Sequence, residues 1–128
     1  QHIALTSSDI YQTICTLRGR GTGFMPTPDT YYEKVNSRVE GHQEDLEALK
    51  ALRILIDGSP TKDGILLQIF TDTVIGPVFF EIIQRKGNEG FGEGNFQALF
   101  ESIELDQIRR GVLSGAEQGE KKGEPSDA

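Results

Sequence analysis

The stretch Val78-Phe79-Phe80-Glu81-Ile82-Ile83-Gln84-Arg85 places a single carboxylate in the middle of an apolar run. Aromatic and β-branched residues dominate it, and this composition predicts a β-strand. Side chains alternate between the two faces of a strand, so Phe79, Glu81 and Ile83 share one face. A carboxylate between apolar neighbours is costly to bury unless a partner compensates its charge. The strand alone leaves two interpretations of Glu81 equally open: an exposed edge-strand residue, or a metal ligand or paired acid.

The composition restricts the class of protein. The chain has 128 residues, enough for one domain with a hydrophobic core, and its net charge is −7. No cluster of Lys and Arg appears, so we expect no nucleic-acid partner. The apolar runs are too short to span a membrane, and the N-terminus shows no signal-peptide pattern. Cys15 is the single cysteine, which excludes an intrachain disulfide and fits an intracellular context.

Hydrophobic periodicity and cap residues predict an order of elements for the whole chain. The predicted elements are a strand at 1–6, a helix that follows the cap cluster Ser7-Ser8-Asp9 and is ended by the glycines of 18–23, a brief strand at 24–25, helices at 30–39 and 44–52, strands at 53–57, 65–71 and 78–85, and a helix capped by Asn95 and ending near 110. Helices and strands do not alternate regularly, so an antiparallel, curved α+β sheet fits this order better than a doubly wound fold. A short connection favours antiparallel pairing of the last two strands.

The predicted C-terminal helix is amphipathic. Its apolar stripe consists of Phe96, Leu99, Phe100, Ile103 and Ile108. Gly111 suits the position just after a helix end. Almost no apolar residues follow, so we expect a disordered acidic tail at 112–128 and a folded domain at 1–111.

The two histidines of the chain have different settings. His42 lies between two predicted helices, where a solvent-exposed loop residue is expected. His2 lies in a predicted strand, on the same face as the small Ala4. On the residues alone, a core or edge histidine without a metal is the ordinary interpretation of His2, because a metal site needs several converging ligands.

His2 and Glu81 together supply two of the three side chains of a 2-His-1-carboxylate set. Such a set holds Fe(II) on one face of an octahedron and leaves the other positions open. Neither His42 nor Cys15 suits the third position, because one lies in a loop and the other within a helix. Either the third ligand precedes Gln1 or the metal interpretation is wrong. The chain begins with Gln1 instead of Met and enters a strand at once, so we expect a fragment of a longer protein.

Several stretches of the sequence carry a resemblance to a known family. They are Gln1-His2-Ile3-Ala4-Leu5, Phe24-Met25-Pro26 with Tyr31-Tyr32, Leu66-Leu67-Gln68-Ile69-Phe70-Thr71, Phe79 to Arg85, and Gly90 to Phe96 followed by Leu99 to Glu104. In this order they resemble the C-terminal part of the 4-hydroxyphenylpyruvate dioxygenase family, over nearly all of 1–111. The resemblance implies the α+β vicinal-oxygen-chelate fold: a βαβββ module with a curved mixed sheet, here an incomplete half-barrel, and a C-terminal capping helix.

The resemblance also implies a set of site residues. His2 matches the second of the family's histidine ligands to an Fe(II) cofactor and Glu81 its carboxylate ligand, while the first histidine falls before Gln1. The implied catalytic polar residues are Gln1 and Gln68, which line the substrate pocket, and Asn95, which anchors the last helix over it. The implied substrate-binding aromatic residues are Phe70, Phe79, Phe91 and Phe96.

The activity implied by the resemblance is the conversion of 4-hydroxyphenylpyruvate and O₂ to homogentisate and CO₂, in tyrosine and phenylalanine catabolism. The expected partners are an aromatic 2-oxo acid and O₂, with neither nucleic acid nor membrane, and the intact protein is expected to be a cytoplasmic homo-oligomer. One alternative is a 4-hydroxymandelate synthase, which oxidises the benzylic carbon of the same substrate; the bulky Phe70 favours the ring hydroxylase. Another alternative is a non-catalytic binding module of this fold. The isolated fragment is expected to be inactive without the first histidine ligand.

Overall fold

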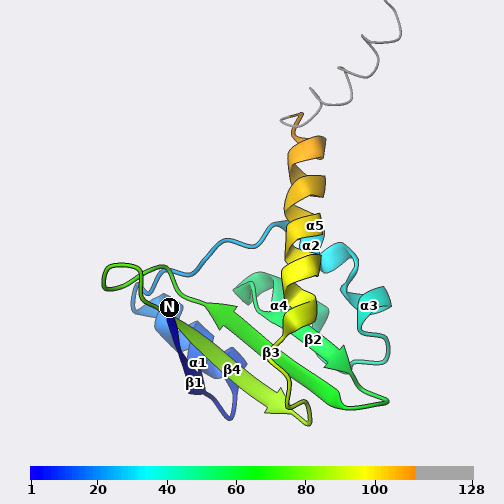
Figure 1. The fold of residues 1–128 in the computed structure, drawn as a ribbon, viewed down its shortest axis with the longest axis horizontal. Coiled ribbons are helices and arrows are strands. Elements are labelled where there is room, and N and C mark those ends of the chain that lie inside the picture. Colours follow the sequence, from blue (N-terminus) through cyan, green and yellow to red (C-terminus); the bar gives the residue numbers. More distant parts are fainter. Residues whose placement is uncertain (112–128) are drawn as a thin grey trace, which may run out of the picture.

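The chain forms helices and strands in the order predicted for a βαβββ module with a terminal helix. The computed structural model describes residues 1–111. Its elements are β1 (His2–Thr6), α1 (Ile10–Gly19), α2 (Asp29–Glu33), α3 (Val35–Arg38), α4 (Leu46–Leu52), β2 (Leu55–Ser59), β3 (Gly64–Phe70), β4 (Phe79–Lys86) and α5 (Glu93–Arg109). The strands form one open sheet in the order β1-β4-β3-β2 (Figure 1). The predicted α+β class and the implied mixed, incompletely closed sheet are therefore confirmed.

The sheet is mixed because β1 runs parallel to β4. Its register places His2 beside Phe79 and Ala4 beside Glu81. The expectation of antiparallel pairing is correct for β2, β3 and β4 and wrong for β1. Short connections favour antiparallel neighbours, but β1 lies beside a strand that the chain reaches only after four helices and two other strands.

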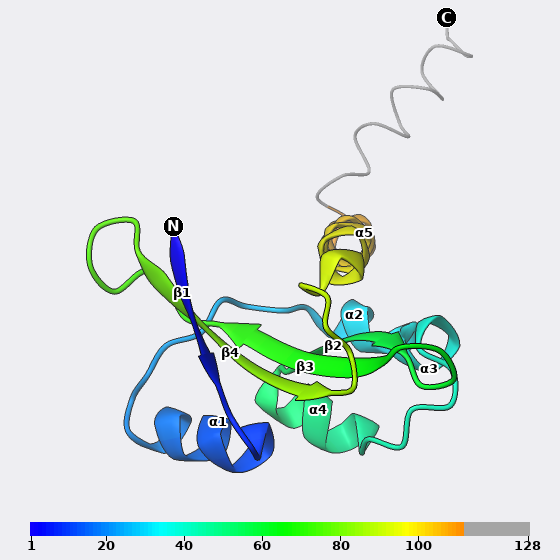
Figure 2. The ribbon, with the colours of Figure 1, turned by 60° about the horizontal axis from the view of Figure 1, so that its bottom comes forward.

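Helices lie on both faces of the sheet. Figure 2 shows α1 and α4 below it and α5 above it. The core between the sheet and the lower helices includes Ile10, Ile14, Leu49, Ile54, Ile56, Ile65, Leu67, Ile69 and Ile82. Burial of this apolar surface is the main stabilising contribution, at about 25 cal/mol per Å². The face toward α5 carries the polar and aromatic residues of the candidate site.

Several of the predicted boundaries are wrong. The helix expected at 30–39 is interrupted at Lys34, which separates α2 from α3. The strand expected at 53–57 begins two residues later, because Arg53 ends α4 in the left-handed conformation at a φ of 62°. The strand expected at 24–25 is reduced to an isolated bridge. In each case tertiary packing overrides a short local pattern.

α5 begins before Asn95, so the prediction that Asn95 caps this helix is wrong. The cap residue is Gly92, with a φ of 76°. A Cβ atom at this position would overlap the amide oxygen of Gln68, and the left-handed conformation also favours glycine. Asn95 lies one turn inside and is 2% exposed. The first turn of α5 therefore sits directly on Gln68 and turns Asn95 toward the sheet.

Polar contacts, more than its apolar stripe, attach α5 to the rest of the described residues. Phe96 and Phe100 are 65% and 60% exposed. The buried Thr30 Oγ1 donates a hydrogen bond to the Ser102 carbonyl at 2.6 Å. The N–H of Gly94 donates to Asp57 Oδ2 at 2.8 Å.

The tail expected at 112–128 lies outside the described residues, and the division at 111 stays a prediction. Within 1–111, each helix is too short or too polar to cross a membrane.

Candidate metal centre and substrate cavity

His2 and Glu81 meet on neighbouring strands. The Nε2 atom of His2 lies 3.3 Å from Oε1 of Glu81, because the register of β1 and β4 turns both side chains to the face toward α5. The side chain of Glu81 is 9% exposed and that of His2 51%. Of the two interpretations of Glu81, the structure thus supports a buried, paired carboxylate. His2 lies on an exposed edge strand with its ring directed at this carboxylate.

The two facing atoms fit a metal ion with cis ligands. For bonds of about 2.1 Å in octahedral geometry, neighbouring donors lie roughly 3 Å apart. Imidazole nitrogen and carboxylate oxygen form the donor set of non-haem Fe(II) sites. Within the part of the chain that the structure describes, no group of three His, Cys, Asp or Glu side chains could hold a metal. His42 does not supply a third ligand beside His2 and Glu81. It lies in the loop after α3, as predicted, and its Nε2 is 2.7 Å from Asn36 Oδ1.

A chain of hydrogen bonds leads away from Glu81 into the protein. Gln68 Nε2 donates to Glu81 Oε2 at 2.6 Å. Asn95 Nδ2 donates to Gln68 Oε1 at 2.7 Å. The Tyr31 hydroxyl donates to Asn95 Oδ1 at 2.5 Å and accepts from Arg38 Nη2 at 2.8 Å. Partners that hold a ligand's second atom fix the orientation of that ligand.

Tyr31 is the hydroxyl at the centre of this chain, and it stays protonated at neutral pH. Burial raises the pKa of Tyr31, and the positive charge of Arg38 opposes the rise in part. The hydroxyl also accepts a hydrogen bond from the Ile56 N–H at 3.0 Å. It therefore has two donors pointing at it and one proton to give.

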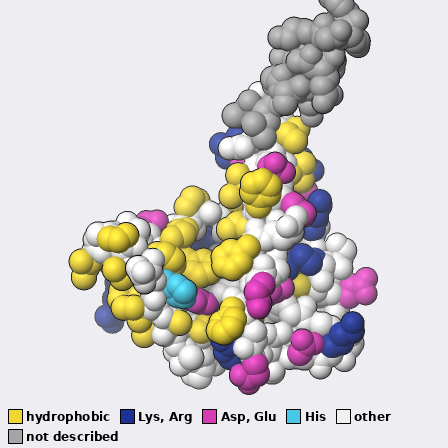
Figure 3. Space-filling model, viewed as in Figure 1, with side chains coloured by type: hydrophobic (Ala, Val, Ile, Leu, Met, Phe, Trp, Pro, Cys, Tyr) yellow, Lys and Arg dark blue, Asp and Glu magenta, His cyan; other side chains and the backbone are white. Residues whose placement is uncertain are grey.

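An apolar cavity of about 420 Å³ opens beside His2 and Glu81. Its remaining lining residues are Met25, Leu55, Phe70, Phe79, Phe91, Asn95, Phe96 and Leu99. Phe79 stacks on the His2 ring, with centroids 5.5 Å apart and an interplanar angle of 19°. Phe70 meets Phe79 edge to face at 6.1 Å. Figure 3 shows hydrophobic side chains gathered between the N-terminal strand and the foot of α5. Such a space suits a flat aromatic ring, because phenyl rings offer offset and edge contacts.

The structure brings together most of the residues named from the sequence. All four predicted aromatic residues line the cavity, together with the predicted metal ligands and Asn95. Gln68 is 1% exposed and lies behind Glu81 instead of in the cavity wall. Gln1 is exposed, and its carbonyl accepts a hydrogen bond from the Phe79 N–H at 3.2 Å. Gln1 is thus the one predicted residue that is neither in the lining nor in the hydrogen-bond chain. The catalytic and binding roles of all these residues stay predictions.

Sequence reasoning missed the parts that Tyr31 and Arg38 play near the site. Tyr31 was named from the sequence only as part of the Tyr31-Tyr32 pair, in a stretch that carries the family resemblance. Arg38 stands among polar residues with no local sign of a buried partner. Both lie in the helices between the first and second strands, and only the tertiary fold carries them to Asn95.

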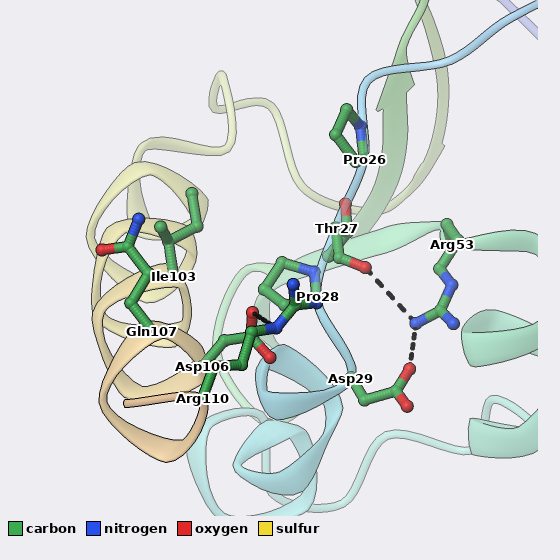
Figure 4. Close-up of a pocket in the computed structure, with 9 residues that line it drawn as sticks. All are labelled: Pro26, Thr27, Pro28, Asp29, Arg53, Ile103, Asp106, Gln107 and Arg110. Atoms are coloured by element: carbon green, nitrogen blue, oxygen red, sulfur yellow. Dashed lines mark hydrogen bonds and ion pairs between the residues drawn. The ribbon is translucent and has the colours of Figure 1, made fainter. Parts of the chain in front are cut away.

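A second cavity, of about 580 Å³, lies between the C-terminal half of α5 and residues 26–29 (Figure 4). Arg53 Nη1 is 2.5 Å from Asp29 Oδ1, and this contact holds the pKa of Asp29 below its usual value. Arg110 Nε is 3.0 Å from Asp106 Oδ2. Both guanidinium groups are paired with carboxylates, so this cavity offers no unbalanced charge for an anionic substrate.

Comparison with known proteins identifies relatives over most of this chain. No family model matches it. A protein of Vibrio vulnificus named "Hemolysin VllY" is 81% identical over 116 residues, which are 91% of this chain and 32% of that protein. A 4-hydroxyphenylpyruvate dioxygenase of Pseudomonas aeruginosa is 74% identical over 113 residues, or 88% of this chain and 32% of the enzyme. Over most of its length, this chain is a homologue of the 4-hydroxyphenylpyruvate dioxygenases. It spans about a third of the length of these curated relatives.

The solved structures agree with this relationship. A variant of 4-hydroxymandelate synthase from Streptomyces coelicolor is 36% identical, with a TM-score of 0.66, and the match covers 84% of this chain and 30% of the synthase. The vicinal-oxygen-chelate fold implied by the family resemblance is confirmed. Homology to the dioxygenases and similarity to the synthase agree on the fold, and they differ in the reaction that each name states.

Proposed function

We propose that the full-length protein, meaning a protein of its relatives' length that carries this chain, is a non-haem Fe(II) dioxygenase. It converts 4-hydroxyphenylpyruvate and O₂ to homogentisate and CO₂. The observation that carries the proposal is the approach of His2 Nε2 to Glu81 Oε1, at 3.3 Å, on the wall of an aromatic cavity. The 74% identity to an enzyme of that name supports the choice of reaction.

His2 and Glu81 would hold the iron in this proposal, with a further histidine before Gln1 as the third ligand. When bound, the iron supplies the activation of O₂. Gln68 keeps one oxygen of Glu81 engaged at 2.6 Å, which leaves Oε1 as the atom that faces His2. The carboxylate is therefore arranged to give one oxygen to the metal.

The aromatic residues would place the substrate ring. Phe70 and Phe96 come from β3 and α5, so they approach the cavity from two sides, while Phe79 forms its wall next to His2. Contacts between aromatic rings favour a planar substrate, and an apolar lining excludes water from the reacting groups. The polar 2-oxo acid end of the substrate would face His2 and Glu81, because the rest of the lining is almost entirely apolar.

Product analysis tests this proposal directly. The full-length protein, loaded with Fe(II) and supplied with 4-hydroxyphenylpyruvate, should consume O₂ and form homogentisate. Formation of 4-hydroxymandelate would transfer the assignment to the synthase reaction, which the similarity to the Streptomyces structure favours as second candidate. Absence of turnover by protein that has bound iron would instead favour a non-catalytic module of this fold.

The assembly and location of the full-length protein belong to the same proposal. We expect a homo-oligomer in the cytoplasm, with a small aromatic 2-oxo acid and O₂ as partners and no nucleic acid or membrane. Light scattering on the purified full-length protein measures its mass, and a monomeric mass would contradict the expected assembly.

A further inference from the structure

The hydrogen-bond chain behind Glu81 has a fixed direction. At one end, the Arg38 guanidinium can only donate hydrogen bonds, and it points Nη2 at the Tyr31 hydroxyl from 2.8 Å. At the other end, an ionised Glu81 carboxylate can only accept, and it faces Gln68 Nε2 at 2.6 Å. The groups between these ends are two amides and one hydroxyl, each of which can both donate and accept.

These two ends determine the orientation of every group between them. Tyr31 receives hydrogen bonds from Arg38 and from the Ile56 N–H. Two acceptors face its own proton, Asn95 Oδ1 at 2.5 Å and the Ile56 carbonyl at 3.1 Å. The nearer Asn95 oxygen takes the proton, because the Ile56 carbonyl already accepts from Arg38 Nη2 at 3.0 Å. Asn95 must then turn its NH₂ group to Gln68, and Gln68 must turn its own NH₂ group to Glu81. A flip of either amide would set two oxygens or two NH₂ groups against each other. Because Asn95 and Gln68 are 2% and 1% exposed, water cannot easily relieve that conflict.

We propose that Tyr31 and Arg38 are positioning residues that act on the metal ligand Glu81 through Asn95 and Gln68. They set the amide orientation of Gln68 and thereby hold Glu81 with Oε1 toward His2. This inference rests on the proposed function, because it takes Glu81 to be an iron ligand. It adds two residues from α2 and α3 that touch neither the metal ligands nor the cavity.

Arg38 also reaches the first turn of α5 by a second route. Its Nη1 lies 3.5 Å from Asp57 Oδ1, and Asp57 Oδ2 accepts from the Gly94 N–H at 2.8 Å. Asn95, the residue after Gly94, accepts a hydrogen bond from Tyr31 at 2.5 Å and a longer one from Arg38 Nη2 itself at 3.5 Å. The Arg38 guanidinium therefore contacts both Tyr31 and Asp57, the two side chains that bind the first turn of α5.

Removal of the Tyr31 hydroxyl tests whether Tyr31 positions Glu81 or only stabilises the fold. Tyr32 provides a matched control. Both tyrosines are in α2, with 2% and 3% of their surface exposed. The Tyr32 hydroxyl donates to the Ile54 carbonyl at 3.0 Å and has no contact with Asn95. Tyr31→Phe and Tyr32→Phe thus each remove one buried hydroxyl from the same helix, but only the first interrupts the chain.

The measurement is the affinity of the full-length protein for Fe(II), determined under anaerobic conditions without substrate. Changes in partners of a metal ligand typically weaken metal binding about 10- to 100-fold. We expect Tyr31→Phe to weaken Fe(II) binding about tenfold and Tyr32→Phe to leave it within about twofold. Arg38→Gln removes a half-buried guanidinium, which can only donate hydrogen bonds. This variant should also weaken Fe(II) binding, and it replaces Tyr31→Phe as the test if that variant does not fold.

A double variant shows whether the effect passes through Gln68. In a Gln68→Leu background, where the connection to Glu81 is already lost, Tyr31→Phe should change Fe(II) affinity by less than about twofold. A full tenfold loss in that background would overturn the inference. Equal Fe(II) affinity of the Tyr31→Phe and Tyr32→Phe proteins would also overturn it while leaving the proposed function intact. A wild-type protein that binds no Fe(II) would defeat the proposed function and this inference together.

Discussion

Glu81 combines a buried position with one oxygen that faces an imidazole. The cost of burying the carboxylate is offset by Gln68 on one oxygen and by His2, or a metal beside it, on the other. Glu81→Ala in the full-length protein should remove a ligand and weaken Fe(II) binding at least 100-fold, as titration under anaerobic conditions would show. The exposed Glu101 is a suitable control, and Glu101→Ala should retain the metal. Retained iron and activity in Glu81→Ala would refute the ligand role.

Gly92 is a second single residue on which the site depends. Gly92→Ala would bring a Cβ atom against the Gln68 amide oxygen and would also strain a backbone with a φ of 76°. Gly41 has a φ of 84° but open space around it, so Gly41→Ala carries the backbone strain alone. We expect Gly92→Ala to cost about 1–3 kcal/mol more in unfolding free energy than Gly41→Ala, measured by denaturant titration. Equal losses would show that the contact with Gln68 is unimportant.

At the scale of elements, α5 depends on buried polar contacts because much of its apolar stripe is exposed among the described residues. Thr30→Val keeps the shape of the side chain but removes its hydrogen bond to the Ser102 carbonyl. We expect a loss of about 1 kcal/mol in unfolding free energy and faster hydrogen exchange in α5. Thr73→Val, in an exposed loop, should change neither. Unchanged exchange in Thr30→Val would contradict the importance of this contact for α5.

Elements with strong local patterns were predictable. The cap of α1 falls within the predicted cluster Ser7-Ser8-Asp9: it is Asp9, whose carboxylate accepts from the Gln12 N–H at 3.2 Å. The alternating apolar residues of β3 and β4 led to correct strands. The start of α5 was not predictable, because Asn95 is an ordinary cap residue by type. Asn95 is instead buried, where its amide donates a hydrogen bond to Gln68. Gln68 is distant in sequence, so no local pattern indicates this contact.

At the scale of the whole molecule, iron should stabilise the folded state if the site forms only on folding. A ligand present at about 100 times its Kd adds about 2.7 kcal/mol to the unfolding free energy. Fe(II) should therefore raise the melting temperature of the full-length wild-type protein under anaerobic conditions. The increase should be absent in Glu81→Ala, whereas Tyr32→Phe should show it in full. The same increase in Glu81→Ala would place the stabilising metal elsewhere.

The α+β class, the strands that carry His2 and Glu81, and the aromatic residues of the cavity could be predicted before the structure was known. These follow from side-chain periodicity and from motifs that resemble a family over most of 1–111, both of which are properties of local stretches. The tertiary structure alone decided that β1 pairs in parallel with β4, which brings Nε2 of His2 to 3.3 Å from Glu81. It also decided that Arg38 and Tyr31 reach Glu81 through Asn95 and Gln68. Strand pairing and buried hydrogen bonds between distant residues depend on which surfaces meet when the chain folds, and no local pattern records that.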